Sequence, residues 1–248
     1  MKKLIVANWK MYPQSAREAV LAFRKIAAGA NGADVVVAPP FPYLSLLRSV
    51  RTVALGAQDV FWEREGAFTG EVSPLMLKAL GVRYVIVGHS ERRRILGETD
   101  EIIAKKLSAA LAARLLPILC VGESERDADG KFFSLVKHQV RTAFAKVKRA
   151  DVPRVVVAYE PVWAIGAGKK SADPKDANEA ALFIKKVIAE FAGAKSAKRV
   201  RVLYGGSVSA KDAAGFLAER EISGLLVGRE SRNPKEFLKI IACAKSHL

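Results

Sequence analysis

V-V-V-A-Y-E-P-V-W-A-I-G-A-G-K, residues 155–169, is the segment from which the architecture of this chain can be worked out. Its first four residues are apolar without a helical period, which is typical of a strand buried on both faces in a parallel sheet. Pro161 cannot donate to a neighbouring strand, so this strand should end at Glu160 and present a carboxylate at its C-terminal edge. Gly166 and Gly168 follow an apolar segment and can offer backbone N–H groups to an anion. The segment predicts a candidate base beside a movable loop, although Glu160 alone would be interpreted as a solvated carboxylate.

Outward from this segment, eight apolar runs alternate with eight amphipathic stretches along the whole chain. The predicted strands are 4–8, 35–38, 53–58, 84–88, 117–121, 155–160, 202–205 and 225–228. The predicted helices are 15–28, 43–50, 74–80, 100–114, 134–148, 174–191, 210–219 and 234–245. This alternation predicts an α/β fold, a closed (β/α)8 barrel of the TIM-barrel class, with residues 1–248 as a single domain. A doubly wound open sheet is the rival, but neither G-x-G-x-x-G after the first strand nor G-x-x-x-x-G-K-[ST] occurs.

Composition limits the kind of protein. The chain of 248 residues is 50% hydrophobic, so it can fill one large core. It has no apolar run of 18 residues and its N-terminal apolar segment is short for a signal peptide, so we expect a cytoplasmic chain that does not enter a membrane. Its two cysteines, Cys120 and Cys243, have neither a disulfide framework nor metal-ligand spacing, which predicts reduced thiols.

The net charge of +16 is unusual for a small metabolic enzyme. Basic clusters at 92–94, 146–149 and 195–201 contribute to it, without the interleaved aromatic residues of a stacking platform for nucleic acid. The simplest interpretation is a solvated basic surface. We expect it to bind polyanions weakly and nonspecifically, and to speed the arrival of an anionic substrate at low salt.

Polar residues gather where the predicted strands end. In such barrels the chemistry lies at the C-terminal ends of the strands. Asn8 and Lys10 follow the first strand, His89 follows the fourth, Glu160 ends the sixth, and Gly-Gly-Ser at 205–207 follows the seventh, where barrels often bind phosphate. Each residue alone is more often a turn former, a surface charge or a structural histidine. Together they predict an active site at one mouth of the barrel.

The same segments carry a family resemblance that spans the chain. The motifs are N-W-K-M at 8–11, G-A-F-T-G-E-V-S at 66–73, G-H-S-E-R-R at 88–93, C-V-G-E at 120–123, A-Y-E-P-V-W-A-I-G at 158–166 and Y-G-G-S-V at 204–208. In this order they resemble the triosephosphate isomerase family. The resemblance implies interconversion of dihydroxyacetone phosphate and D-glyceraldehyde 3-phosphate by proton transfer through an enediolate, with a triose phosphate as substrate and without a metal or organic cofactor.

The resemblance also implies catalytic roles. Glu160 matches the base and His89 the electrophile, a pairing for which this family is a standard example. Ser90 begins a plausible helix, whose N–H dipoles would keep the imidazole of His89 neutral. Lys10 matches the cation beside the enediolate, and Asn8 would hydrogen-bond the substrate oxygen.

Further roles follow from the same resemblance. Glu91 would orient Lys10, Ser90 would hold Glu160 while the lid is open, and Tyr204 would support the site. The phosphate-binding residues implied are Asn8, Lys10, Gly166, Ser207, Gly228 and Arg229, the last four through backbone N–H groups.

Four departures from the family pattern are visible, and one is the atypical Met-Tyr-Pro at 11–13, which lies past Lys10. Val-Gly-Arg-Glu-Ser at 227–231 replaces the usual V-G-G-A-S, and we expect Arg229 to have an ordinary φ, to point away from the phosphate and to be partly neutralised by Glu230. The far hinge of the lid reads Lys-Lys-Ser at 169–171 instead of K-T-A, and Ala167 replaces a threonine, which predicts altered lid kinetics. Asp59 replaces an asparagine.

The segment 66–73 resembles the loop with which the family dimerises, and Thr69 would reach the partner's Asn8 and Lys10 region, so a homodimer is implied. Two other functions remain open at this point. One is a Schiff-base aldolase on the same fold with Lys10 as nucleophile. The other is a catalytically idle barrel whose basic surface binds nucleic acid.

Overall fold

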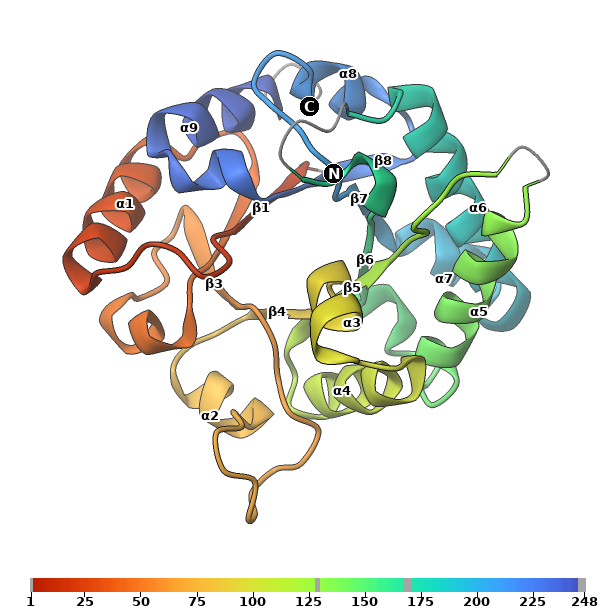
Figure 1. Ribbon diagram of the computed structural model, residues 1–248, viewed down its shortest axis with the longest axis horizontal. Coiled ribbons are helices and arrows are strands. Elements are labelled where there is room, and N and C mark those ends of the chain that lie inside the picture. Colours follow the sequence, from red (N-terminus) through yellow and green to blue (C-terminus); the bar gives the residue numbers. More distant parts are fainter. Residues whose placement is uncertain (1, 128–129, 167–170, 245–248) are drawn as a thin grey trace.

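The computed structural model describes residues 2–127, 130–166 and 171–244 of the chain, and its centre is a closed parallel barrel (Figure 1). The strands pair in sequence order, and β1 closes the barrel against β8. The strands are β1 (Leu4–Asn8), β2 (Asp34–Ala38), β3 (Val53–Ala57), β4 (Tyr84–Val87), β5 (Leu116–Val121), β6 (Val156–Tyr159), β7 (Arg201–Tyr204) and β8 (Ile222–Val227). The predicted (β/α)8 barrel is therefore confirmed.

A ring of helices surrounds the barrel (Figure 1). The α-helices are α1 (Ala16–Gly29), α2 (Pro74–Ala79), α3 (Ser90–Leu96), α4 (Asp100–Ala112), α5 (Phe132–Phe144), α6 (Pro174–Ala192), α7 (Ala194–Arg199), α8 (Ala213–Ala218) and α9 (Pro234–Cys243). Short 3₁₀ helices are η1 (Phe41–Leu46), η2 (Val152–Arg154), η3 (Val162–Ala164) and η4 (Arg229–Arg232). Several helices begin at residues suited to that position: the side chains of Ser15, Ser73, Thr99, Asp173 and Asn233 each accept a hydrogen bond from the first turn.

The structure differs from the predicted elements in several places, and one is α3, which the eight predicted helices did not include although a helix start was expected at Ser90. The helix predicted at 43–50 is wrong, because the chain forms the 3₁₀ helix η1, with a proline near its start, and then pairs Val50 with Val53 in an isolated bridge. The strand β8 begins three residues earlier than predicted, since Gly224 allows close approach to β1: a Cβ there would lie 1.9 Å from the carbonyl oxygen of Leu4. Helix α7 was not predicted as a separate element, and Gly193 separates it from α6.

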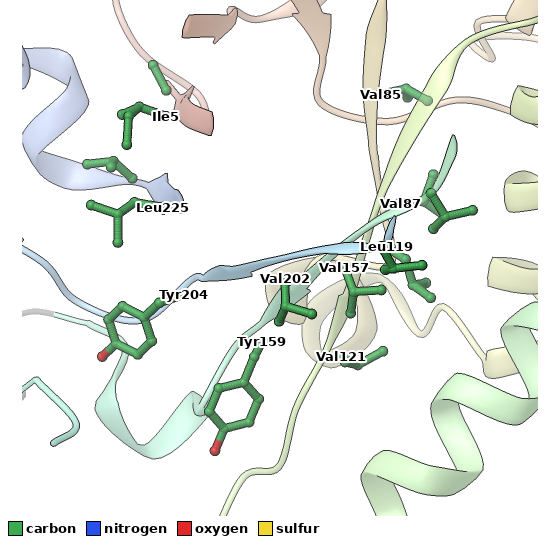
Figure 2. Close-up of a cluster of buried hydrophobic side chains, with 14 of the residues drawn as sticks. Ile5, Val85, Val87, Leu119, Val121, Val157, Tyr159, Val202, Tyr204 and Leu225 are labelled. Atoms are coloured by element: carbon green, nitrogen blue, oxygen red, sulfur yellow. The ribbon is translucent and has the colours of Figure 1, made fainter. Parts of the chain in front are cut away.

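Side chains of the strands alternate between two buried clusters. Leu4 and Val6 of β1 point to a cluster inside the barrel, whereas Ile5 and Ala7 belong to the larger cluster between the barrel and the helices. Figure 2 shows part of this larger cluster, contributed by β1, β4, β5, β6, β7 and β8. Both faces of every strand are thus covered, as the uninterrupted apolar runs predicted.

None of the helices in the part of the chain that the structure describes is both long and apolar enough to cross a membrane.

The interior of the barrel should be the region least tolerant of lost volume. Leu203 of β7 is fully buried there, so Leu203→Ala should lower the free energy of unfolding by about 2–5 kcal/mol, measured by urea denaturation. Leu182→Ala on α6 is the matched control, because this leucine is 41% exposed and its loss should cost no more than about 1 kcal/mol. Equal losses in the two variants would contradict the assignment of the inner cluster.

Candidate active site

The C-terminal ends of the strands surround a pocket of about 410 Å³. Its lining includes seven of the residues singled out from the sequence: Asn8, Lys10, His89, Gly166, Ser207, Gly228 and Arg229. Glu160 and Ser90 line a neighbouring cavity instead. Segments from opposite ends of the chain therefore meet at one mouth of the barrel.

Lys10 is held in a strained backbone conformation. Its φ is 53°, a left-handed value that costs a non-glycine residue roughly 1–2 kcal/mol. Two contacts offset this cost: the Lys10 N–H donates to Asn8 Oδ1 over 3.0 Å, and Gln58 Nε2 donates to the Lys10 carbonyl over 2.8 Å. Gln58 also donates to the carbonyl of Ala38, so it ties the end of β1 to the end of β2. The turn after β1 therefore fixes where the ammonium group begins.

The ammonium of Lys10 forms an ion pair with Glu91 at the start of α3, with Nζ 2.5 Å from Oε1. Partial burial acts to raise the pKa of Glu91, but the hydrogen bond from Lys10, the nearby His89 and the charge of Lys10 outweigh it. The pKa of Glu91 therefore lies below its usual value. The pair connects the turn after β1 to the first turn of α3.

His89 is buried and caps helix α3. Its Nδ1 accepts a hydrogen bond from the Glu91 N–H over 3.2 Å, so that nitrogen carries a lone pair and the ring proton belongs on Nε2. Nε2 lies 3.2 Å from Oε1 of Glu160. The helix start expected at Ser90 is confirmed, and it leaves His89 able to donate a hydrogen bond toward the mouth of the barrel.

Glu160 is only 1% exposed. Its Oε2 accepts a hydrogen bond from the Ser90 N–H over 2.8 Å, whereas Oε1 has no hydrogen-bond partner among the described atoms. Two glycines make room for this residue: a Cβ at Gly205 would lie 2.9 Å from its Cγ, and one at Gly122 would lie 1.9 Å from its carbonyl oxygen. The carboxylate is thus held beside the pocket, with one oxygen free.

Cys120 lies next to this carboxylate on β5. Burial raises the pKa of the Cys120 thiol well above its usual value, and the nearby charge of Glu160 acts in the same direction. The thiol remains protonated and contributes no second negative charge beside Glu160.

The anion-binding side of the pocket is built largely from backbone. Gly228 precedes η4, and the first N–H groups of a helical turn have no intrahelical acceptor, so the amide of Arg229 is available to an anion. The Ser207 N–H differs, because it donates to the Ala164 carbonyl over 3.2 Å. The hydroxyl of Tyr204 accepts from the Ala172 N–H over 3.1 Å, and burial raises the pKa of Tyr204 to about 12. Tyr204 and Ser207 therefore connect the pocket to both sides of the expected lid.

Only part of what was expected of Arg229 is found in the structure. Within the described residues, Lys10 and Arg114 are the non-glycine residues with positive φ, so the ordinary φ predicted for Arg229 is confirmed. Arg229 and Glu230 both line the pocket and form no ion pair with each other in the described chain, so the partial neutralisation expected from Glu230 involves no direct contact. Of the expected lid, residues 167–170 lie outside the described residues.

A buried charge network was not recognised from the sequence. Nζ of Lys106 lies 2.8 Å from Oδ1 of Asp59 and 2.5 Å from Oε1 of Glu98, while Arg92 contacts both carboxylates, at 2.9 and 2.6 Å. Arg92 is in the first turn of α3 and Glu98 follows its end, so the network fixes both ends of this helix. Asp59 was noted only as a departure from the family pattern, and Lys106, which it contacts, lies 47 residues away in the sequence, so no local signal joined them.

No group of three or more His, Cys, Asp and Glu side chains arranged to hold a metal ion occurs within residues 2–127, 130–166 and 171–244.

A closed parallel barrel with a carboxylate, an imidazole and an ammonium at its C-terminal mouth defines a (β/α)8-barrel enzyme. Comparison with known proteins identifies which one. The family model described as triosephosphate isomerase matches residues 3–244. The chain is 46% identical over 246 residues to the triosephosphate isomerase of Caldanaerobacter subterraneus subsp. tengcongensis, covering 97% of this chain and 98% of the relative. It is 43% identical over 246 residues to that of Dictyoglomus turgidum, with the same coverage. The chain belongs to the triosephosphate isomerase family and is an isomerase.

Replacing Glu91 with Gln should remove part of the acid sensitivity of the fold. The pKa of Glu91 is lower in the folded chain than in the unfolded chain, where it is about 4.3, so its ion pair contributes stability above that pH and loses it as the pH falls through the folded pKa. In urea denaturation, Glu91→Gln should be less stable than the wild type at neutral pH, and the difference should vanish in strong acid.

The control for this experiment is Glu125→Gln, since Glu125 is exposed and has no ion pair in the described chain. It should leave the pH profile unchanged. A gap between Glu91→Gln and the wild type that stays constant with pH would refute the role of the ion pair.

Proposed function

We propose how this chain carries out the reaction of its family, the interconversion of dihydroxyacetone phosphate and D-glyceraldehyde 3-phosphate. The reaction moves a proton between two neighbouring carbons through an enediolate, so it needs a base for a carbon-bound proton and a proton donor for the adjacent oxygen. The observation that carries the proposal is the buried carboxylate of Glu160, with one oxygen unpartnered and 3.2 Å from Nε2 of His89 at the barrel mouth.

Glu160 is the base in this mechanism. Its carboxylate is held by the Ser90 N–H beside the main pocket, so it leaves that N–H and turns toward the substrate as the lid closes. A carboxylate shielded from water is a stronger base toward carbon than a solvated one. The start of α3 therefore supplies a resting place for the base, which is the role expected for Ser90.

His89, Lys10 and Asn8 stabilise the enediolate. Nε2–H of His89 donates to the carbonyl oxygen and passes its proton between the two oxygens of the intermediate. The ammonium of Lys10 balances the developing charge, and at about 4 Å and an effective dielectric of ~20 such an interaction is worth roughly 4 kcal/mol. Asn8, which already fixes the Lys10 backbone, hydrogen-bonds the substrate from the same side.

The phosphate is bound by the backbone amides of Gly166, Ser207, Gly228 and Arg229. For Ser207 this requires an exchange, because its N–H leaves the Ala164 carbonyl to bind the phosphate. Ala164 ends η3, next to the expected lid, so phosphate binding and movement of this segment are coupled. Holding the phosphate in place keeps it from being eliminated from the enediolate.

A Schiff-base aldolase is not supported by the geometry. Nζ of Lys10 lies 2.5 Å from a carboxylate, and an ion-paired ammonium has no lone pair for attack on a carbonyl. The idle barrel that binds nucleic acid is also not favoured, since the chain belongs to an enzyme family and its candidate base and electrophile are in contact.

Substitution of the base tests the mechanism. Glu160→Gln keeps the shape of the side chain but cannot accept the proton, so kcat in a coupled isomerase assay should fall by about 10²–10⁴-fold or more, with a small change in KM. Glu160→Asp keeps a base, but at a longer distance from the substrate, so its kcat should fall less. The control Glu125→Gln should keep wild-type kcat. Full turnover by Glu160→Gln would rule out this residue as the base.

We also propose that the chain works as a homodimer in the cytoplasm. The loop 66–73 between β3 and α2 projects from the body of the molecule (orange, Figure 1) and carries the half-exposed Phe68. Met11 and Ile95 are 88% and 66% exposed, and a partner subunit would cover such apolar side chains. Cys120 is a buried free thiol, in keeping with a reducing compartment.

The dimer should depend on Ile95 and on salt. In sedimentation experiments, Ile95→Glu should shift the protein toward monomer, whereas Leu182→Glu on the outer surface of α6 should not. Because the chain carries a charge of +16, repulsion between subunits should increase the monomer fraction at about 0.01 M salt relative to ~0.15 M. A wild-type monomer at both salt concentrations would refute the homodimer.

A further inference from the structure

The N-terminal end of the barrel, opposite the active site, contains a second hollow, of about 920 Å³. It is formed by the turns that lead into β2, β3, β4 and β5, together with the first residue of β7. Val36, Ala54 and Leu116 form its apolar floor, where the inner cluster of the barrel ends. This volume is at the upper end of the range typical of small-molecule sites.

Basic side chains dominate the walls of this hollow, which we call the basic bowl. Seven of its 23 lining residues are Lys or Arg, compared with 41 of 248 in the whole chain, and Asp34 is its one acidic residue. The basic bowl is therefore almost twice as rich in cations as the chain as a whole, and much poorer in carboxylates. Because the whole-chain figure includes the buried core, the scarcity of carboxylates distinguishes the basic bowl from the rest of the surface more than the number of cations does.

Five of the seven cations have no ion-pair partner within the described chain. Arg201 pairs with Asp34 at 2.9 Å, and Arg154 pairs with Asp151 at 2.7 Å. The remaining five, which have exposed side chains, are Lys2, Arg51, Lys78, Arg83 and Arg114. Like charges gathered around one concavity repel each other and raise the local concentration of anions. Their repulsion is relieved when an anion binds.

The backbone of Arg114 fixes where one of these cations begins. Arg114 has a φ of 61°, a conformation that favours glycine, and it directly follows the last turn of α4. Among the described residues, the other non-glycine residue with positive φ is Lys10, whose charge lies in the active-site pocket. Lys10 and Arg114 thus both have a left-handed backbone conformation, and each places a cation in a concave region of the surface. At Arg114 the end of α4 accounts for this φ, because the N–H groups of Arg114 and Leu115 donate to the carbonyls of Leu111 and Ala110.

We propose that the basic bowl binds a compact polyanion that carries several phosphate groups. Guanidinium groups bind phosphate oxygens through paired, charge-assisted hydrogen bonds, and five unpaired cations match a ligand of several negative charges. A nucleic acid fits less well, because the one aromatic residue of the lining, Tyr84, is buried and offers no face for base stacking. The site is separate from the isomerase pocket, since the two lie at opposite ends of the strands.

Calorimetric titration with inorganic tripolyphosphate tests this assignment on the full chain. Arg83→Gln/Arg114→Gln should weaken binding at the basic bowl by about ten-fold or more, because two charge-assisted contacts are lost. Arg83→Lys/Arg114→Lys keeps both charges and should retain most of the affinity. Lys105→Gln/Lys186→Gln removes the same charge from exposed positions of α4 and α6 outside the bowl, and should bind like the wild type. Wild-type affinity should fall steeply between about 50 and 200 mM salt.

Kinetics separate the basic bowl from the active site. Tripolyphosphate that also enters the isomerase pocket would act as a competitive inhibitor, and its inhibition constant should be the same in the wild type and in Arg83→Gln/Arg114→Gln. The proposal would be overturned if Arg83→Gln/Arg114→Gln bound tripolyphosphate with wild-type affinity. It would also be overturned if the Lys105→Gln/Lys186→Gln control lost as much affinity. Tighter binding of a single-stranded oligothymidine of matched charge, lost with Arg83 and Arg114, would instead show a nucleic-acid site and would also overturn it.

Discussion

The start of helix α3 is the point on which the geometry of the site depends. The Glu91 N–H fixes the imidazole of His89, the Ser90 N–H holds the carboxylate of Glu160, and the carboxylate of Glu91 holds Lys10. One helical turn thus positions three charged or titratable groups that come from β1, β4 and β6. A small rotation of α3 would disturb all three contacts together, and catalytic geometry tolerates errors of well under about 1 Å.

This dependence explains the buried network beneath α3. A helix of seven residues has little stability of its own. Arg92 and Glu98 anchor its two ends to Lys106 of α4 and to Asp59 after β3, with opposite charges in balance. Buried ion pairs contribute little net stability, but removal of one partner costs about 3–5 kcal/mol, so such a network gives a defined orientation rather than a more stable fold. The charge at Asp59 completes this balance.

The barrel, and the residues that gather at its mouth, could be predicted because both depend on short stretches of sequence. Each strand is an apolar run, and the residue that follows it lies at a fixed edge of the barrel, so Asn8, His89 and Glu160 could be placed from strand ends alone. The network of Asp59, Arg92, Glu98 and Lys106 could not, because its members share no periodicity and meet only when α3 and α4 pack. The same holds for the strain at Lys10 and for the early start of β8, which depends on the approach of Gly224 to Leu4.

Charge is distributed differently at the two ends of the barrel. At the C-terminal mouth, Lys10 is balanced by Glu91, and much of the expected phosphate contact comes from neutral amides. Backbone amides of this kind bind an anion without adding net charge, so a product with the same phosphate can leave again. At the N-terminal end, unpaired cations surround a concavity with a single carboxylate. Three Lys or Arg residues line the pocket at the mouth and seven line the basic bowl, so positive charge is denser at the end where no reaction sets a limit on affinity.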